Sequence, residues 1–190
     1  MKKIVITGGA GFIGSNSALH FAKNGWKVYL IDNLSRKGAK DNLSTLKKNI
    51  KLTFYKVDVS NFSSISNIIK KIKPNLLIHC AGQVAVTKSV LDPRTDFNSN
   101  VLGTINVLES IRLFSKKTRL INTSTNKVYG NISKTKITQG KKRYSYSYKI
   151  KNIDENQPLD FLSPYGCSKG SADQYVNDYS RIYGLDTVVL

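Results

Sequence analysis

Short runs of apolar residues alternate along the chain with longer segments in which apolar side chains recur every three or four positions. The short runs have the length of buried strands, and the longer segments have the spacing of helices with one apolar face. This alternation is typical of a doubly wound α/β domain, in which helices cover both faces of a parallel sheet. It predicts strands at 3–6, 27–31, 52–57, 75–79, 119–123 and 187–190, and helices at 12–23, 41–48, 62–71, 96–115 and 164–183.

Two features depart from this regular pattern. Residues 131–162 form a long polar segment with little helical periodicity, and a loop of this length in a compact domain usually has a function. We expect an insertion loop that binds a ligand or covers a site near the active centre. The sequence stops at Leu190 inside an apolar strand, and a central strand seldom lies uncovered. We therefore expect one domain over residues 1–190, truncated before a last strand and a further domain.

A glycine-rich turn lies between the first expected strand and the first expected helix, at residues 7–14. The start of a helix offers N–H groups and the positive end of its dipole to a phosphate group. In such a turn Gly8 permits the tight bend, Gly11 lets the backbone approach the phosphate, and Gly14 lets the helix pack on the strand. The spacing Gly-x-x-Gly-x-x-Gly is not specific by itself, so the second strand has to support the interpretation.

Asp32 ends that second strand. A carboxylate in this position accepts hydrogen bonds from both hydroxyl groups of an adenosine ribose and repels a 2′-phosphate. The sequence therefore predicts a Rossmann-type dinucleotide site that takes NAD in preference to NADP. Arg36 and Lys37 follow closely and would weaken that preference, since either side chain pairs with a phosphate.

Composition narrows the class of protein. The chain has 40% hydrophobic residues and no apolar run long enough to span a membrane, which is typical of a globular protein without a membrane partner. Cys80 and Cys167 are best explained as reduced thiols of a cytoplasmic protein. His20 and His79 lack partners at ligand spacing, so we expect both to be structural and the chain to hold no metal.

The formal net charge of +18 raises the question of a nucleic-acid partner. The lysines are spread along the whole chain, and charge alone says little about function, so we expect none. One segment, residues 141–149, interleaves basic residues with tyrosines. It fits stacking on bases, contact with the diphosphate of a nucleotide-sugar, or a solvated insertion.

A tyrosine and a lysine four positions apart begin the last expected helix, after Ser163 as a cap and Pro164 in the first turn. Tyr165 and Lys169 thus share one helix face. A neighbouring ammonium lowers a tyrosine pKa from about 10, which makes the phenol a usable general base. Residues 123–125, Thr-Ser-Thr, end the fifth strand, where a hydroxyl can bond the oxygen that changes between alcohol and ketone.

These motifs together resemble the extended short-chain dehydrogenases/reductases, the class that includes nucleotide-sugar epimerases and dehydratases. Residues 7–14 match its cofactor motif, and Tyr165 and Lys169 match its catalytic pair. The resemblance implies Thr125 as the catalytic hydroxyl, with Ser124 as the alternative. It implies adenine contacts at residues 58–59 and ribose contacts at 81–83. It also implies that Asn100 helps to order the active site. The implied cofactor-binding residues are Gly8, Gly11, Phe12, Ile13, Gly14, Asp32, Asn33, Ser35, Arg36, Asp58, Val59, Ala81, Gly82, Gln83, Asn100, Thr123, Tyr165 and Lys169.

Four stretches are most similar to members of the class that epimerise CDP-linked deoxyhexoses: 32–39, 81–85, 124–130 and 163–170. The resemblance implies reversible oxidation at C2 of the sugar with NAD regenerated in each cycle, and we expect a homo-oligomer at full length. A 4-epimerase stays open, because the same three residues serve at C4. A 4,6-dehydratase would carry an acidic pair where Asn126 and Lys127 stand. A truncated NAD-binding protein without activity is the remaining alternative.

Overall fold

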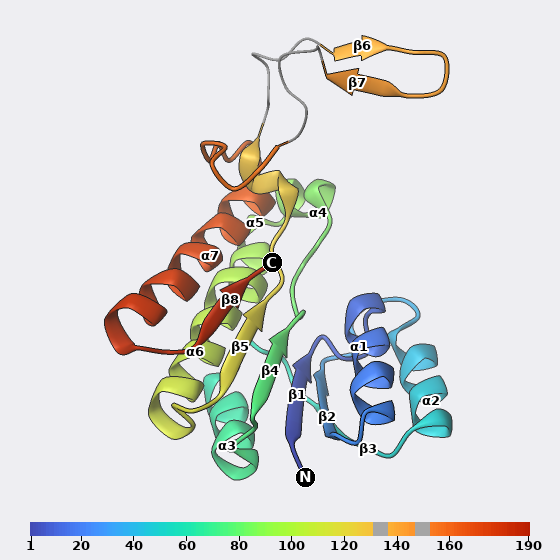
Figure 1. Ribbon diagram of the computed structural model, residues 1–190, viewed down its shortest axis with the longest axis vertical. Coiled ribbons are helices and arrows are strands. Elements are labelled where there is room, and N and C mark those ends of the chain that lie inside the picture. The colour runs from blue at the N-terminus through green and yellow to red at the C-terminus, as the bar shows by residue number, and fades with distance from the viewer. Residues whose placement is uncertain (131–136, 147–152) are drawn as a thin grey trace.

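The computed structural model describes residues 1–130, 137–146 and 153–190 (Figure 1). Within them, six strands form one parallel sheet in the order β3-β2-β1-β4-β5-β8. The strands are β1 (Lys3–Thr7), β2 (Lys27–Asp32), β3 (Leu52–Lys56), β4 (Leu76–His79), β5 (Arg119–Asn122) and β8 (Thr187–Val189). The Rossmann-type sheet predicted from the sequence is thus confirmed, and each strand lies within two residues of its predicted position.

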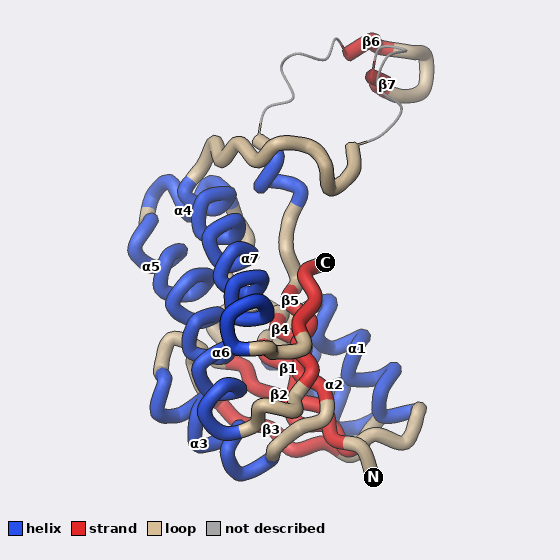
Figure 2. Tube along the Cα trace, turned by 60° about the vertical axis from the view of Figure 1, so that its left-hand side comes forward, coloured by secondary structure: helices blue, strands red, loops and turns tan. Residues whose placement is uncertain are grey.

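Helices cover both faces of this sheet (Figures 1 and 2). One face carries α1 (Phe12–Lys23) and α2 (Ala39–Asn49), and the other carries α3 (Phe62–Ile72), α6 (Gly103–Phe114) and α7 (Pro164–Tyr183). Successive strand residues point to opposite faces, so Ile4 and Ile6 pack with α1 and α2 while Val5 packs with α3 and α6. Both faces of the central strands are buried, which is why these strands read as continuous apolar runs.

The ends of α7 agree with the predicted bounds, and local capping explains why. The Ser163 side chain accepts a hydrogen bond of 3.0 Å from the N–H of Gly166, and Pro164 occupies the first helical position. Gly184, with φ of +66°, ends the helix in the left-handed conformation. Helix α1 also agrees with its predicted bounds.

The expected helix at 96–115 is wrong in detail. The chain forms α5 (Pro93–Phe97), a π-helical turn, Asn98–Leu102, and then α6. The helical run begins three residues earlier than predicted because Asp92 caps it, accepting a hydrogen bond of 3.0 Å from the N–H of Thr95. A further short helix, α4 (Val86–Leu91), was not predicted. Both corrections concern the region that follows β4, where the site lies.

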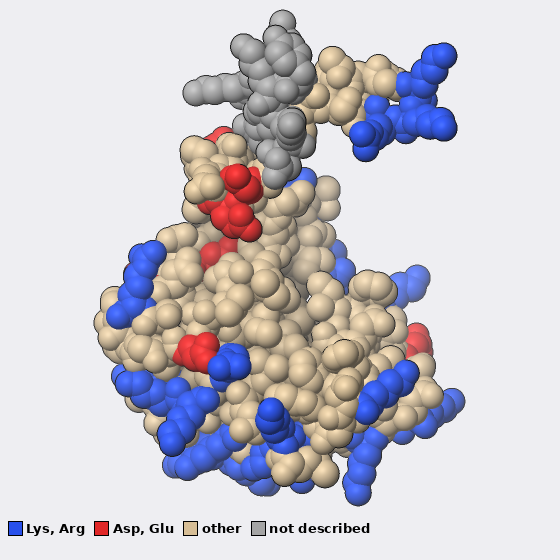
Figure 3. Space-filling view, viewed as in Figure 1, with Lys and Arg blue, Asp and Glu red and all other residues tan. Residues whose placement is uncertain are grey.

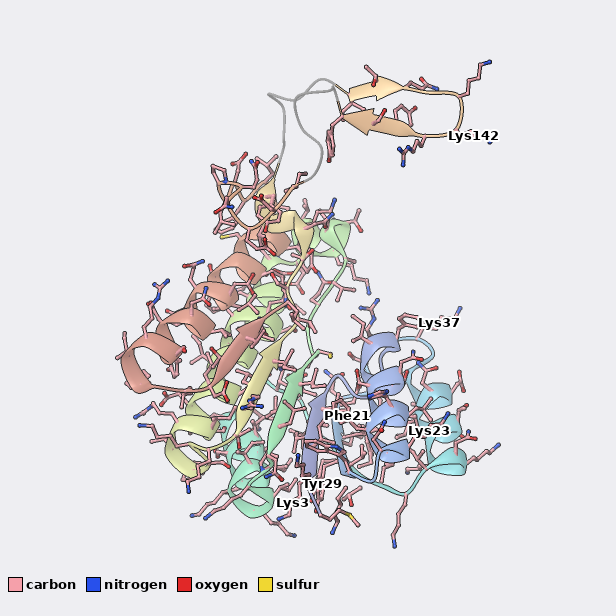
Figure 4. All side chains as sticks on the ribbon, viewed as in Figure 1. Lys3, Phe21, Lys23, Tyr29, Lys37 and Lys142 are labelled. Atoms are coloured by element: carbon pink, nitrogen blue, oxygen red, sulfur yellow. The ribbon has the colours of Figure 1, made fainter. Side chains whose placement is uncertain are left out.

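The insertion contains structure that the sequence did not predict. After a 3-10 turn at Asn126–Tyr129, strands β6 (Ile137–Gln139) and β7 (Tyr144–Tyr146) form an exposed antiparallel hairpin. Figure 4 shows Lys142 at its tip. The expectation of a ligand-binding or covering loop partly falls on residues 131–136 and 147–152, which lie outside the described residues, and it stays a prediction.

The order of the strands determines where a ligand site is expected. After β1 the chain passes to α1 on one face, and after β4 it passes to α4 and α6 on the other (Figure 1). In an open parallel sheet, this reversal leaves a crevice beyond the carboxyl ends of the two strands. The glycine turn follows β1 and residues 81–83 come shortly after β4, so both predicted cofactor segments lie where this crevice is expected.

Basic side chains gather around the opposite, amino-terminal edge of the sheet, where Lys3 lies (Figures 3 and 4). Many of them end helices: Lys47 and Lys48 in the last turn of α2, and Lys70 and Lys71 in that of α3. Cations stabilise a helix at its carboxyl end, so these lysines have a structural explanation that needs no partner. None of the described helices combines the length and apolar character that crossing a membrane requires.

Candidate active site

The glycine turn packs against the end of β4. Gly8 has φ of +63°, and a Cβ atom there would lie 2.7 Å from both the carbonyl oxygen of Cys80 and the nitrogen of Ala81. A Cβ atom at Gly14 would overlap the carbonyl oxygen of Gly8. The geometry agrees with the expected tight turn and close helix packing, because no side chain fits at either position. Contact between this turn and a cofactor stays a prediction.

Helix α1 starts at this turn without a side-chain cap from any described residue. Gly11 is its N-cap, and the N–H of Gly11 donates to the carbonyl oxygen of Gly8 at 2.9 Å. The N–H groups at the start of a helix lack partners within the helix and attract anions. Phe12 and Ile13, predicted as cofactor contacts, lie in this first turn with 83% and 55% of their surface exposed. The helix start can therefore receive a phosphate through its backbone.

The Asp32 carboxylate lies at the end of β2 and orders the loop around it. It accepts hydrogen bonds from the N–H of Ala10 at 3.0 Å and from the N–H of Leu34 at 2.8 Å. Each carboxylate oxygen can accept more than one hydrogen bond, so ribose hydroxyl groups can still bind. Ser35, Arg36 and Lys37 continue this loop, and Lys37 lies on the same sheet edge as the start of α1 (Figure 4).

Asn33 and Asp58, both expected to contact the cofactor, are brought together. The Asn33 side-chain amide donates to the Asp58 carboxylate at 2.6 Å. Burial alone would raise the pKa of Asp58, but hydrogen bonds from the backbone and side chain of Ser60 and from Asn33 outweigh it and hold the pKa below its usual range. Val59 is buried beside Gly103 at the start of α6. The Asp58 carboxylate is therefore ionised at neutral pH and held in place by these hydrogen bonds.

The residues after β4 enter a buried polar network. The N–H of Gln83 donates to the side-chain oxygen of Asn100 at 2.9 Å, and a Cβ atom at Gly82 would lie 2.6 Å from that same oxygen. The Asp96 carboxylate, 1% exposed, accepts from the Gln83 amide at 3.0 Å, the Asn100 amide at 3.2 Å and the Ser168 hydroxyl at 2.5 Å. Sequence reasoning missed Asp96 and Ser168. The network fixes the 81–83 segment against the helix that carries the predicted catalytic pair.

His79, the last residue of β4, and Cys80 come directly before the 81–83 segment of this network. His79 is buried between the hydroxyl groups of Thr7 and Thr104, in agreement with the structural role expected for it, and burial together with the Lys169 charge lowers its pKa to about 3. Burial raises the Cys80 pKa to about 11, against opposing effects of Thr123 and Lys169. Both cysteines are free thiols, as predicted.

Tyr165 and Lys169 lie on the first turns of α7, and both are buried. The N–H of Tyr165 donates to the Ser89 hydroxyl on α4 at 3.1 Å, so the unpredicted helix α4 helps to hold the tyrosine. The Lys169 ammonium donates to the carbonyl oxygen of Thr123 at 2.5 Å. Burial lowers the pKa of Lys169, while the charges of Asp173, Cys80 and Asp96 act in the opposite direction.

The end of β5 brings Thr125 to the start of α7. A Cβ atom at Gly166 would lie 2.9 Å from the carbonyl oxygen of Lys127, so the turn after Thr125 packs closely on the helix turn that holds Tyr165. Thr125 caps that turn, its hydroxyl accepting from the N–H of Lys127 at 3.3 Å. The Ser124 hydroxyl instead donates to the buried carboxylate of Asp173. This arrangement favours Thr125 over Ser124 as the reactive hydroxyl.

The profile of the GDP-mannose 4,6 dehydratase family matches residues 5–190. The chain belongs to that family. It is 46% identical over 187 residues to the CDP-paratose 2-epimerase of Salmonella typhi, covering 98% of this chain and 55% of the relative. It is 34% identical to a putative UDP-glucose 4-epimerase of Methanocaldococcus jannaschii, covering 98% of this chain and 54% of that protein.

A solved structure with a similar fold contains a bound cofactor. The UDP-glucose 4-epimerase of Thermus thermophilus, in complex with NAD, superimposes with a TM-score of 0.79 at 29% identity and covers 98% of this chain and 53% of its own. The chain therefore spans about half the length of the relatives it matches. Family membership confirms the resemblance to extended short-chain dehydrogenases/reductases, while the contacts of individual site residues stay predictions.

Proposed function

We propose that the protein is an NAD-dependent nucleotide-sugar epimerase that inverts C2 of a CDP-linked deoxyhexose, converting CDP-paratose to CDP-tyvelose. The contact between Lys169 and the carbonyl of Thr123 carries the proposal, because it joins the helix of Tyr165 to the strand end of Thr125. Identity of 46% with a CDP-paratose 2-epimerase supports the choice of sugar and carbon.

The residues around the crevice fit NAD. Gly8 and Gly14 leave room that a Cβ atom would fill, helix α1 lacks a side-chain cap among the described residues, and Asp32 ends the adjoining strand. These features suit a pyrophosphate and an adenosine ribose with free hydroxyl groups. When bound, NAD would accept a hydride from the sugar and return it.

In the proposed reaction, Tyr165 takes the proton of the sugar hydroxyl as its carbon becomes a ketone. Lys169, four positions further along the same helix, is the proposed partner of Tyr165 and would help to hold the cofactor ribose. Thr125 donates a hydrogen bond to the oxygen that changes its state. The ketone rotates within the site so that its other face receives the hydride. Tyr165 then returns the proton to the oxygen. No net oxidation results.

A 4-epimerase is the second candidate, because a putative UDP-glucose 4-epimerase is 34% identical and the same three residues would act at C4. A 4,6-dehydratase needs acidic groups to expel water, and Asn126 and Lys127 do not supply them. Two free thiols support a cytoplasmic location. The exposed apolar side chains of Leu113 on α6 and Ile182 on α7 support a homo-oligomer.

Proton NMR of the full gene product with CDP-paratose and no added NAD tests the proposal. We expect signals of the C2 epimer to appear, because the cofactor remains bound and is regenerated. Turnover of a UDP-hexose with CDP-paratose unchanged would replace the proposal by the 4-epimerase. NAD binding without turnover of either sugar would leave only the non-catalytic alternative.

A further inference from the structure

Two side chains of α7, one helical turn apart, bind three consecutive residues at the end of β5. The Lys169 ammonium bonds the carbonyl oxygen of Thr123 at 2.5 Å. The Asp173 carboxylate accepts from the Asn122 side-chain amide at 3.1 Å and from the Ser124 hydroxyl. The strand end that leads directly to Thr125 is thus fixed to the helix that bears Tyr165. The proposed reaction assigns no part to Asp173.

The burial of Asp173 makes these contacts energetically significant. The residue is 7% exposed, and a buried carboxylate is costly unless hydrogen bonds and a positive charge compensate it. Ser124 and Asn122 supply the hydrogen bonds, and Lys169 supplies the charge. Burial raises the pKa of Asp173, whereas these three neighbours oppose the rise.

The charged and titratable groups around Lys169 come from several elements. Asp173 lies on α7, Asp96 on α5, and His79 and Cys80 at the end of β4. Asp96 is already bonded by three side-chain donors, and burial favours the neutral forms of His79 and Cys80. Among the groups that raise the Lys169 pKa, Asp173 has the largest effect. Asp173 is therefore a counter-charge one helical turn from the buried ammonium, on the same helix.

We propose that Asp173 is a positioning residue, which holds the strand end so that Thr125 meets the substrate and places a negative charge one helical turn from the Lys169 ammonium. This role rests on the proposed epimerase function. It predicts two separable effects: one depends on the contact with Ser124, and the other depends on the negative charge.

Three variants of the full gene product separate these effects. In Asp173→Asn we expect kcat to fall on the order of 10²-fold with little change in KM, because a catalytic group is misplaced. The alkaline limb of the pH profile should move to lower pH, since the ammonium loses a counter-charge. Ser124→Ala should lower kcat without moving that limb. Asp178→Asn, an exposed position on α7 paired with Arg181, should match the wild type.

The lysine can also be followed without turnover. Carbon-13 NMR of the isotopically labelled Lys169 side chain, assigned with Lys169→Met, should show a lower pKa in Asp173→Asn and the wild-type pKa in Asp178→Asn. If the wild type turns over no sugar, the proposed function fails while this titration still decides the role of the charge. An unchanged titration, or a kcat that falls only as far as the folded fraction falls, would overturn the role of Asp173.

Discussion

The Thr7 hydroxyl lies 2.6 Å from Nδ1 of His79 and joins β1 to β4 at the edge of the sheet that faces the crevice. On the other side of the ring, Nε2 lies 3.2 Å from the Thr104 hydroxyl, whose own proton is donated to the carbonyl of Asn100. Nε2 must therefore carry the hydrogen, and Nδ1 must accept from Thr7. A second ring proton, on Nδ1, would require the Thr7 hydroxyl to accept from the ring instead of donating to it.

This arrangement predicts that stability falls in acid. The pKa of His79 is lowered to about 3 in the folded protein, so between pH 6.5 and 3 the unfolded chain binds a proton that the folded chain does not. The free energy of unfolding should therefore fall by about 1.4 kcal/mol for each unit by which the pH is lowered through this range. Urea titrations of the wild type and His79→Gln measure the difference in slope. The exposed His20→Gln is the control, and identical slopes in all three proteins would refute the assignment.

A pair of glycines tests the packing of the turn on β4. Gly8 and Gly25 both have positive φ, at +63° and +77°, but a Cβ atom at Gly25 meets no atom within 4 Å. Gly25→Ala should cost only the conformational strain of about 1–2 kcal/mol. Gly8→Ala should cost about 1–3 kcal/mol more because of overlap with the backbone of Cys80 and Ala81 after β4, and should abolish NAD binding. Thermal unfolding and calorimetric titration give both quantities. Equal destabilisation by the two variants would contradict the close contact.

The Asp32 carboxylate is expected to select the cofactor. In Asp32→Asn, one charged acceptor becomes a neutral amide, and the NAD affinity should fall at least about tenfold. The NADP affinity should rise, because the repulsion of its 2′-phosphate is removed and Arg36 remains nearby. Calorimetric titration with both cofactors measures the ratio. An unchanged preference for NAD would show that Asp32 does not select the cofactor.

The two thiols should differ in reactivity. Cys167 is exposed on α7, whereas burial raises the Cys80 pKa to about 11 and keeps that thiol protonated. A thiol reagent at pH 8 should therefore modify one group rapidly, and Cys167→Ser should remove that rapid phase. Denaturant should expose the second. Rapid labelling in Cys167→Ser would show that Cys80 is reactive.

The catalytic assignments predict a matched pair of tyrosine variants. Tyr165→Phe should lower kcat about 10²- to 10⁴-fold and change the NAD affinity much less, since the proton-transfer group is lost while the other cofactor-binding residues remain. Tyr175→Phe, on the same helix with 44% of its surface exposed, should have wild-type activity. Thr125→Val should lower kcat with NAD binding retained. If Ser124→Ala lost more activity than Thr125→Val, the choice between the two hydroxyl groups would reverse.

The elements that the sequence predicted correctly are specified by residues within or next to each element. Ser163 and Gly184 mark the ends of α7, and the apolar runs at β1 and β2 suffice to place those strands. Helix α4 has six residues, too few to show a period. Strands β6 and β7 are exposed at every residue and have no buried face to create an alternation. Elements without a buried stripe are therefore the ones that periodicity misses.

The site was only partly accessible from the sequence for the same reason. Tyr165 and Lys169 are four residues apart, so their common face follows from helix geometry alone. The partners of Asp96 and Asp173 are distant in sequence, and the bonds from Ser168 to Asp96 and from Ser124 to Asp173 span 72 and 49 residues. Such pairs form only when the whole sheet and its helices have assembled.

The π turn at Asn98–Leu102 has a consequence for tolerated chain length. An α-helix rotates each successive side chain by about 100°, and one additional residue shifts everything after it by roughly that angle. Before and within the turn, Asp96 and Asn100 meet α7 and the β4–α4 loop, whereas Val107 and Ile111 beyond it belong to the core under the sheet. Deleting a single residue here would put one of these two surfaces out of phase, so the number of residues in this segment is constrained as tightly as their identity.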